Sequence, residues 1–219
     1  YQLTACVWAR IILEDDHGVK PSDMMWVRGG IEHAGRPEKI TIKLPPGVRM
    51  EDAPEGTTIS ELLERGDIDA FIAPRAPSLA GKSNPNIGWL FPDPIAAGRD
   101  YFKRTGIFPI MHFVAIKRPL YQRQPWMAVN LYRAFEEAKD RSIARIRNMM
   151  ISHFPLPWNP DNARRASEMF GGDFWPYGVD PNRKTLEAFL TFAYEQGVAH
   201  RKVALDEVFP PSVQHILKV

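Results

Sequence analysis

Two side chains are suited to acid–base and anion chemistry. His112 lies within residues 107–116, the most apolar strand-like stretch of the chain, and a histidine can accept or donate a proton near neutral pH. Arg75 follows a second apolar stretch, residues 68–73, and lies between two prolines. Ligands collect at the carboxyl ends of strands in α/β sheets, where a guanidinium can grip a carboxylate with two hydrogen bonds. The structural alternatives are a core histidine bonded to the backbone and an exposed loop arginine.

Five further residues are candidates for binding an anionic or aromatic ligand. Gln2 and Thr4 stand where the first helix is expected to begin, and the backbone N–H groups there attract anions. Arg104 can hold a second carboxylate, while Trp175 and Tyr177 can stack on a flat ring. Each has a structural alternative. For Gln2 and Thr4 it is a plain N-cap, for Arg104 a salt bridge at the seam between two lobes, and for the aromatic pair packing in the core or at that seam.

The other potentially reactive residues lack the spacing of a reactive site. Cys6 has no identifiable activating partner, Ser78 has no triad, and Gly29-Gly30 lacks the G-x-G-x-x-G fingerprint. A solvated helix end explains the run that starts at Asp15 better than a cation site does. No metal-ligand spacing such as H-E-x-x-H joins the remaining histidines, which are His17, His33, His153, His200 and His215. We therefore predict no metal and no organic cofactor.

The elements that must position these residues follow an α/β order in the first half of the chain. Apolar residues at helical spacing predict a helix over 3–13, with Gly18 as its stop. A capping box of Thr58 and Glu61 predicts a second helix over 58–65 that Gly66 ends. Residues 74–94 are predicted to form a surface excursion. Strands are predicted over 24–27, 40–44 and 68–73.

The second half is predicted to be helical after one strand. Residues 107–116 are typical of a strand, and a long helix should run from Gln124 to about Met150, with Pro125 in its first turn. Two more helices are predicted over 162–170 and 183–196. An α/β segment, then a strand, then helices is the pattern of a two-lobed binding protein whose chain crosses back to the first lobe.

Composition excludes several classes of protein. Of 219 residues, 44% are hydrophobic and 25% charged, as in a globular protein. A formal net charge of +2 without a clustered basic face argues against nucleic-acid binding. No apolar run approaches the roughly 20 residues of a membrane span, and no signal-peptide pattern opens the chain. The single cysteine permits no internal disulfide, and we expect a cytoplasmic protein.

Several stretches resemble one enzyme family. The specific ones are Arg104-Thr-Gly-Ile-Phe-Pro-Ile-Met-His and Gly172-Asp-Phe-Trp-Pro-Tyr-Gly-Val-Asp-Pro-Asn-Arg-Lys-Thr-Leu-Glu. Tyr1-Gln-Leu-Thr-Ala, Ala73-Pro-Arg-Ala-Pro-Ser and the run Glu61-Leu-Leu-Glu-Arg-Gly-Asp-Ile-Asp-Ala accompany them, although the last is similar to a feature of many solute-binding proteins. Together they resemble the 4,5-dihydroxyphthalate decarboxylase family of phthalate catabolism. The resemblance spans nearly all of the chain.

The resemblance implies a periplasmic-binding-protein-like type II fold, which is α/β with two lobes and with C-terminal helices packing back on the first lobe. Residues 1–106 would be the second lobe, and residues 107–219 the crossing strand and the returning helical part. Relatives carry about a hundred more residues in front, enough for about one small domain. The N-terminal portion of the first lobe is therefore expected to be missing, and the family favours a homo-oligomer.

The implied activity is cofactor-independent decarboxylation of 4,5-dihydroxyphthalate to 3,4-dihydroxybenzoate. This chemistry needs a general acid for the ring carbon, stabilisation of charge on a ring hydroxyl, and a pocket that orients a small aromatic carboxylate. His112 would then deliver the proton, and Arg75 would grip a carboxylate. The substrate-binding residues would be Gln2, Thr4, Arg104, Trp175 and Tyr177.

Two other functions fit the same residues. A solute-binding protein of an ABC-type transporter, for an aromatic or thiamine-precursor-like ligand, would use this fold without chemistry. A secretion signal on the full-length gene product would favour that function. The third hypothesis is an inactive lobe whose exposed seam drives self-association.

Overall fold

The chain divides into two compact units. The structure, a computed structural model, describes residues 1–35, 42–81 and 84–215. Unit 1 comprises Tyr1–Met111 and Glu187–Ala204, and unit 2 comprises His112–Leu186 and Leu205–Val219. Helices and a parallel strand pair are both present, so the predicted mixed α/β class is confirmed. The assignment of residues 1–106 and 107–219 to two lobes stays a prediction.

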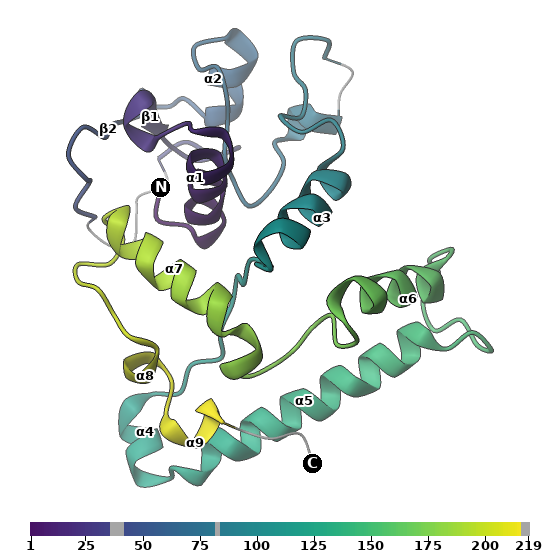
Figure 1. Cartoon of the computed structure of the whole chain (residues 1–219). Coiled ribbons are helices and arrows are strands. Elements are labelled where there is room, and N and C mark those ends of the chain that lie inside the picture. Colours follow the sequence, from purple (N-terminus) through teal and green to yellow (C-terminus); the bar gives the residue numbers. More distant parts are fainter. Residues whose placement is uncertain (36–41, 82–83, 216–219) are drawn as a thin grey trace. The chain divides into compact units, whose positions relative to one another are not determined.

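The α-helices and strands of the two units are labelled in Figure 1. Unit 1 contains α1 (Thr4–His17), η1 (Pro21–Asp23), β1 (Met25–Arg28), β2 (Arg49–Asp52), α2 (Ile59–Arg65), η2 (Ser78–Gly81) and α3 (Pro94–Thr105). Unit 2 contains α4 (Arg118–Arg123), α5 (Trp126–Arg147), α6 (Asn159–Phe170), η3 (Asp180–Asn182), α8 (Leu205–Val208) and α9 (Pro211–Gln214). Helix α7 (Arg183–Glu195) begins in unit 2 and continues into unit 1.

Helix α1 supplies the centre of the unit 1 core. Val7, Trp8 and Ile11 are almost completely buried, and each side chain of this kind contributes roughly 1.5–3 kcal/mol when it leaves water. The Trp8 ring lies 5.6 Å from the Phe189 ring, and its Nε1–H donates to the carbonyl of Ile110 at 3.2 Å. The partly buried residues packed against this cluster are Ile107, Ala188, Phe189, Phe192 and Val198.

The first two helices end where the sequence predicts. Gly18 and Gly66 adopt left-handed backbone conformations, with φ of 67° and 77°. This conformation is unfavourable for residues with a Cβ atom, so glycine ends a helix at little cost. The predicted capping box is also confirmed, because the Thr58 hydroxyl accepts from the backbone N–H of Glu61 at 3.2 Å and the Glu61 carboxylate accepts from that of Thr58 at 2.8 Å.

Replacing Thr58 by alanine should lower the free energy of unfolding by about 1 kcal/mol, because the backbone N–H of Glu61 loses the hydroxyl that accepts its hydrogen bond. Chemical denaturation followed by circular dichroism measures this loss. Thr57→Ala is the matched control and should change the free energy by less than about 0.5 kcal/mol. Equal effects of the two substitutions would show that the capping box does not stabilise α2.

Strands β1 and β2 form a parallel pair in which Arg28 lies opposite Asp52, and their side chains form an ion pair. The predicted strand over 24–27 is thus confirmed in position as β1, although it is mostly half-buried and not fully buried. Gly29 follows it where a Cβ atom would lie 3.0 Å from the side chain of Ile59. A Cβ atom at this position would therefore require the side chain of Ile59 or Ala53 to shift by a few tenths of an ångström.

The predicted strands over 68–73 and 107–116 are not formed, and the described part of the strand predicted over 40–44 is not a strand either. Residues 42–44, 68–73 and 107–116 are neither helix nor strand, and the first two residues of the predicted 40–44 strand lie outside the described residues. An isolated apolar stretch becomes a strand only when a neighbour satisfies its backbone groups. The carbonyls of Ile72 and Ile110 instead accept hydrogen bonds from the Cys6 and Trp8 side chains of α1.

The predicted helices of the second half are confirmed with shifted ends. The helix over 124–150 is α5, the one over 162–170 is α6 with three more residues at its start, and the one over 183–196 is α7. Helix α3 was not predicted. Its signals are local, since Asp93 accepts from the backbone N–H of Ala96 at 2.9 Å, Pro94 occupies the first position, and Gly106 ends it.

Candidate active site

Arg75 lies in a segment that is anchored on both sides. The Cys6 thiol contacts the Ile72 carbonyl at 3.7 Å. The Glu32 carboxylate accepts hydrogen bonds from the backbone N–H of Ser78 at 2.7 Å and from its hydroxyl at 3.2 Å. Arg75 itself is exposed, and no hydrogen bond or ion pair joins it to another residue in the described part of the chain. The segment thus presents a guanidinium that is available to an anion.

The start of α1 offers backbone N–H groups without a side-chain cap. The N-cap residue is Leu3, and no side-chain hydrogen bond caps the helix. Thr4 is the first helical residue, so the alternative that Thr4 is a plain N-cap is wrong. Gln2 and Thr4 are both partly buried. The first N–H groups of a helix have no intrahelical partner and lie at the positive end of its dipole, so this end can receive an anion.

Arg104 binds two carboxylates of unit 1 itself. Its terminal nitrogens lie 3.2 and 2.8 Å from the two oxygens of Asp16, and its Nε lies 2.9 Å from Asp100. These hydrogen bonds raise the pKa of Arg104 and hold the pKa of Asp16 below its ordinary value. Because the guanidinium is already engaged, this geometry favours the salt-bridge alternative over binding of a substrate carboxylate.

Replacing Arg104 by glutamine should lower the melting temperature at pH 7 by no more than about 2–4 °C, because half-exposed ion pairs contribute little. Asp16 has a lower pKa folded than unfolded, so the pair stabilises the protein above the unfolded pKa and the effect is lost as pH falls through the folded value. The melting temperatures of the wild type and of Arg104→Gln should therefore converge at acid pH. Arg65→Gln, which breaks an exposed pair with Asp67, is the control. A difference in melting temperature that persists at pH 2 would show that the effect does not come from the ion pair of Arg104 with Asp16.

His112 is exposed on an irregular stretch and not buried in a strand. It has no hydrogen bond to another of the described residues. The alternative of a core histidine bonded to the backbone is therefore wrong. The carbonyl of Ile110, two residues earlier, is fixed by the Trp8 side chain, so the chain that leads to His112 is anchored. The imidazole is accessible to a ligand.

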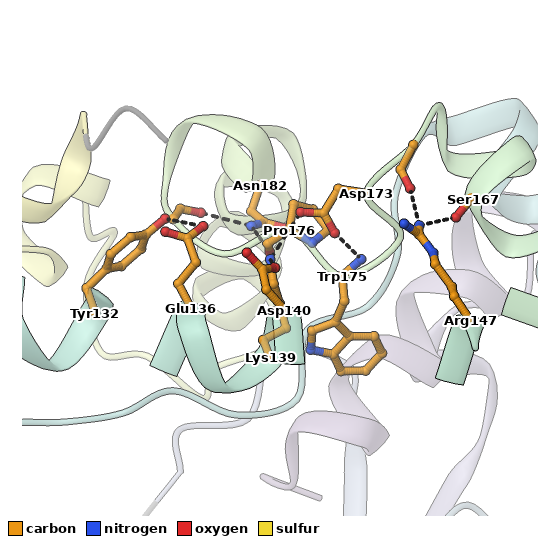
Figure 2. A network of polar contacts seen from close by, with 12 residues as sticks. Tyr132, Glu136, Lys139, Asp140, Arg147, Ser167, Asp173, Trp175, Pro176 and Asn182 are labelled. Atoms are coloured by element: carbon orange, nitrogen blue, oxygen red, sulfur yellow. Dashed lines mark hydrogen bonds and ion pairs between the residues drawn. The ribbon is translucent and has the colours of Figure 1, made fainter. Parts of the chain in front are cut away.

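The loop 172–178 carries Trp175 and Tyr177, the two predicted aromatic residues. Hydrogen bonds hold this loop from several directions (Figure 2). The side-chain amide of Asn182 donates to the carbonyls of Pro176 and Gly178, both at 2.8 Å. Arg147 of α5 donates to the carbonyl of the first loop residue at 3.1 Å. These contacts fix the backbone on both sides of the aromatic residues.

The two aromatic side chains of this loop differ in accessibility. Trp175 is 53% exposed, whereas Tyr177 is partly buried. The Lys139 ammonium lies 5.0 Å from the centre of the Tyr177 ring and 3.1 Å from the Asp173 carboxylate. The other oxygen of Asp173 accepts the backbone N–H of Trp175 at 3.0 Å. Trp175 is therefore the more accessible of the two aromatic side chains.

A cavity of about 330 Å³ in unit 1 does not contain the predicted residues. Its charged lining residues are Glu14, Asp15, Glu195 and Lys20. The excess of carboxylates makes this cavity electrostatically unfavourable for an aromatic dicarboxylate. It is therefore not the candidate site.

The structure brings only some of the predicted residues together. Gln2, Thr4, Arg75 and Arg104 belong to unit 1, whereas His112, Trp175 and Tyr177 belong to unit 2. Within unit 1, the contact of Ile72 with Cys6 brings the segment leading to Arg75 against the first turns of α1. Arg104 instead binds Asp16 in the last turn, about 18 Å along the helix from Thr4.

Lys139 was not among the predicted site residues, although a local signal existed. It follows Tyr132 and Phe135 at spacings of seven and four residues, so it lies on the apolar stripe of α5. A lysine on such a stripe is rarely buried without a partner. Its position therefore indicated that a carboxylate from another part of the chain would pair with it. In the structure this carboxylate is that of Asp173.

The described residues contain neither a metal-binding cluster nor a membrane-spanning helix. Residues 1–35, 42–81 and 84–215 contain no group of three or more histidine, cysteine and acidic side chains that could hold a metal ion. No helix in these ranges combines the length and the apolar character needed to cross a membrane. The predictions of no cofactor and of a cytoplasmic protein stay predictions.

The chain is similar to two curated 4,5-dihydroxyphthalate decarboxylases. The one from Comamonas testosteroni is 41% identical over 219 residues, which are 100% of this chain and 66% of that protein. The one from Pseudomonas putida is 52% identical over 103 residues, which are 47% of this chain and 40% of that protein. The chain thus spans 66% of the length of the first relative. No family model matches the chain.

Proposed function

Because this chain belongs to the 4,5-dihydroxyphthalate decarboxylase family, we propose that the protein converts 4,5-dihydroxyphthalate into 3,4-dihydroxybenzoate and carbon dioxide. The observation that carries the proposal is 41% identity over all 219 residues to the Comamonas testosteroni decarboxylase. Both similar proteins are decarboxylases, so nothing favours the transporter alternative.

In this reaction the bond between a ring carbon and its carboxyl group breaks, and carbon dioxide leaves. The electron pair of the bond stays on the ring carbon, which takes up one proton. A hydroxyl para to that carbon lets the ring accommodate charge while the bond breaks, provided that the protein stabilises that charge. The balance needs no oxidant or reductant, and we propose no metal and no organic cofactor.

His112 is the proposed proton donor. Its exposed imidazole is not hydrogen-bonded to another described residue, so its ring nitrogens are free to face a ligand. A positioned general acid typically contributes about 10²–10⁴-fold to the rate. The imidazole would regain its proton from solvent after each turnover.

Arg75 is the proposed anchor for the carboxylate that stays on the ring. It is exposed on a segment that Cys6 and Glu32 hold in place. Binding an anion would therefore cost little conformational entropy apart from that of the Arg75 side chain itself. The uncapped start of α1, with Gln2 and Thr4, is the second proposed anion-binding element. Arg104 keeps a structural role because Asp16 and Asp100 occupy its guanidinium.

A periplasmic-binding-protein-like type II architecture is the proposed fold. Unit 1 supports it, because it contains a parallel strand pair within an α/β order of elements and receives the chain again at Glu187–Ala204. A homo-oligomer in the cytoplasm remains part of the proposal. Gel filtration with light scattering would give the number of copies per particle.

The test is to incubate the purified protein with 4,5-dihydroxyphthalate and to measure carbon dioxide and 3,4-dihydroxybenzoate, which should form in equal amounts. Phthalate is the matched control because it has both carboxylates without the hydroxyls, so it should bind without reacting. Absence of product at saturating substrate would contradict the proposed function. Turnover that a chelator abolishes and a metal ion restores would overturn the cofactor-free mechanism.

A further inference from the structure

A buried charge ties α5 to the loop 172–178. The Lys139 side chain is only 5% exposed, and a buried ammonium is unfavourable unless carboxylates compensate it. Two do so, since Nζ lies 3.1 Å from Asp173 and 3.4 Å from Asp140. Asp140 is the next residue of the same helix, whereas Asp173 belongs to the loop. The Asp173 pair therefore connects the helix to the loop (Figure 2).

Asp173 transmits this constraint to Trp175. One carboxylate oxygen binds Lys139, and the other accepts the backbone N–H of Trp175 at 3.0 Å. The ammonium also lies 5.0 Å from the centre of the Tyr177 ring, on the other side of Trp175 along the chain. A single charged group therefore contacts the residues two before and two after Trp175.

Trp175 remains 53% exposed although hydrogen bonds hold the backbone of its loop. An exposed indole leaves a large apolar surface in water, and a rigid one can bind a flat ring at a low cost in conformational entropy. We infer that Lys139 is a positioning residue that, through Asp173, orients Trp175 as the stacking surface for the substrate ring. This inference rests on the proposed function, because the ring is that of 4,5-dihydroxyphthalate.

If Lys139 were only structural, replacing it would lower the stability of the protein without weakening the binding of a ligand at Trp175. A double-mutant cycle separates the two roles, because residues that act through one another have non-additive effects. The variants are Lys139→Met, which keeps the length of the side chain without its charge, Trp175→Ala, and the double variant. Lys139→Arg tests rescue, and Arg141→Met, on an exposed position of the same helix, is the matched control.

Each single substitution should raise KM for 4,5-dihydroxyphthalate about tenfold, a typical loss for one aromatic stacking contact, and change kcat less than about threefold. The double variant should show the same KM as either single one. Lys139→Arg should return KM to within about threefold of the wild-type value, and Arg141→Met should leave it unchanged. Quenching of tryptophan fluorescence by phthalate should decrease in Lys139→Met to the level seen in Trp175→Ala.

Additive effects on KM in the double variant would overturn the inference. Trp175→Ala changes an exposed side chain and therefore tests the idea even if Lys139→Met does not fold; a wild-type KM in this variant would also overturn it. The proposed function fails separately, through absence of product formation by the wild-type protein. Wild-type turnover with unaffected variants would refute the positioning role alone.

Discussion

Replacing His112 by alanine is expected to lower kcat for 4,5-dihydroxyphthalate by about 10²–10⁴-fold, because the ring carbon loses its proton donor. Binding should be largely retained, since the proposed role of the imidazole is to protonate the ring carbon and not to hold the carboxylates. The dissociation constant of phthalate should therefore change less than about threefold. Steady-state kinetics and fluorescence titration on the same preparation measure both quantities.

His153→Ala is the matched control for this substitution. His153 is an exposed histidine of the same unit, 3.4 Å from the side-chain amide of Asn148. Its removal should leave kcat unchanged. A His112→Ala variant that loses binding but turns over normally at saturation would exclude His112 as the proton donor.

Replacing Arg75 by alanine should mainly raise KM, by about 10–100-fold. A hydrogen-bonded pair with a charged group contributes about 1.5–3 kcal/mol, and each 1.4 kcal/mol corresponds to a factor of ten. The effect on kcat should be smaller than about threefold, because the carboxylate that Arg75 holds is the same before and after the bond breaks. The KM of Arg75→Lys should lie between those of the wild type and Arg75→Ala, since an ammonium group cannot form the two parallel hydrogen bonds of a guanidinium.

Arg65→Ala is the control for the Arg75 substitution. Arg65 is an exposed arginine of unit 1 that pairs with Asp67 at 3.0 Å. Its loss should leave KM unchanged, which separates local binding from a general change in surface charge. An unchanged KM for Arg75→Ala would assign the carboxylate contact to another group, and the start of α1 would then be the next element to test.

The features that the sequence determined by itself depend on residues close together in the chain. Gly18 and Gly66 end their helices because the left-handed conformation is a property of one residue. The cap of α2 joins Thr58 and Glu61, three positions apart. The specific motifs likewise identified the family, since a motif is a run of neighbouring residues.

Only the tertiary structure decided which apolar stretches are strands and which charges are paired. Residues 68–73 and 107–116 have strand-like composition but form no strand, because pairing requires a neighbour that the sequence of a stretch does not specify. One carbonyl of each, that of Ile72 and that of Ile110, instead accepts a hydrogen bond from a side chain of α1. Arg104 binds Asp16, 88 positions away, and Lys139 binds Asp173, 34 positions away. Such pairs form only when separate elements pack together, so the sequence alone did not show that Arg104 is engaged by carboxylates or that Lys139 binds the loop 172–178.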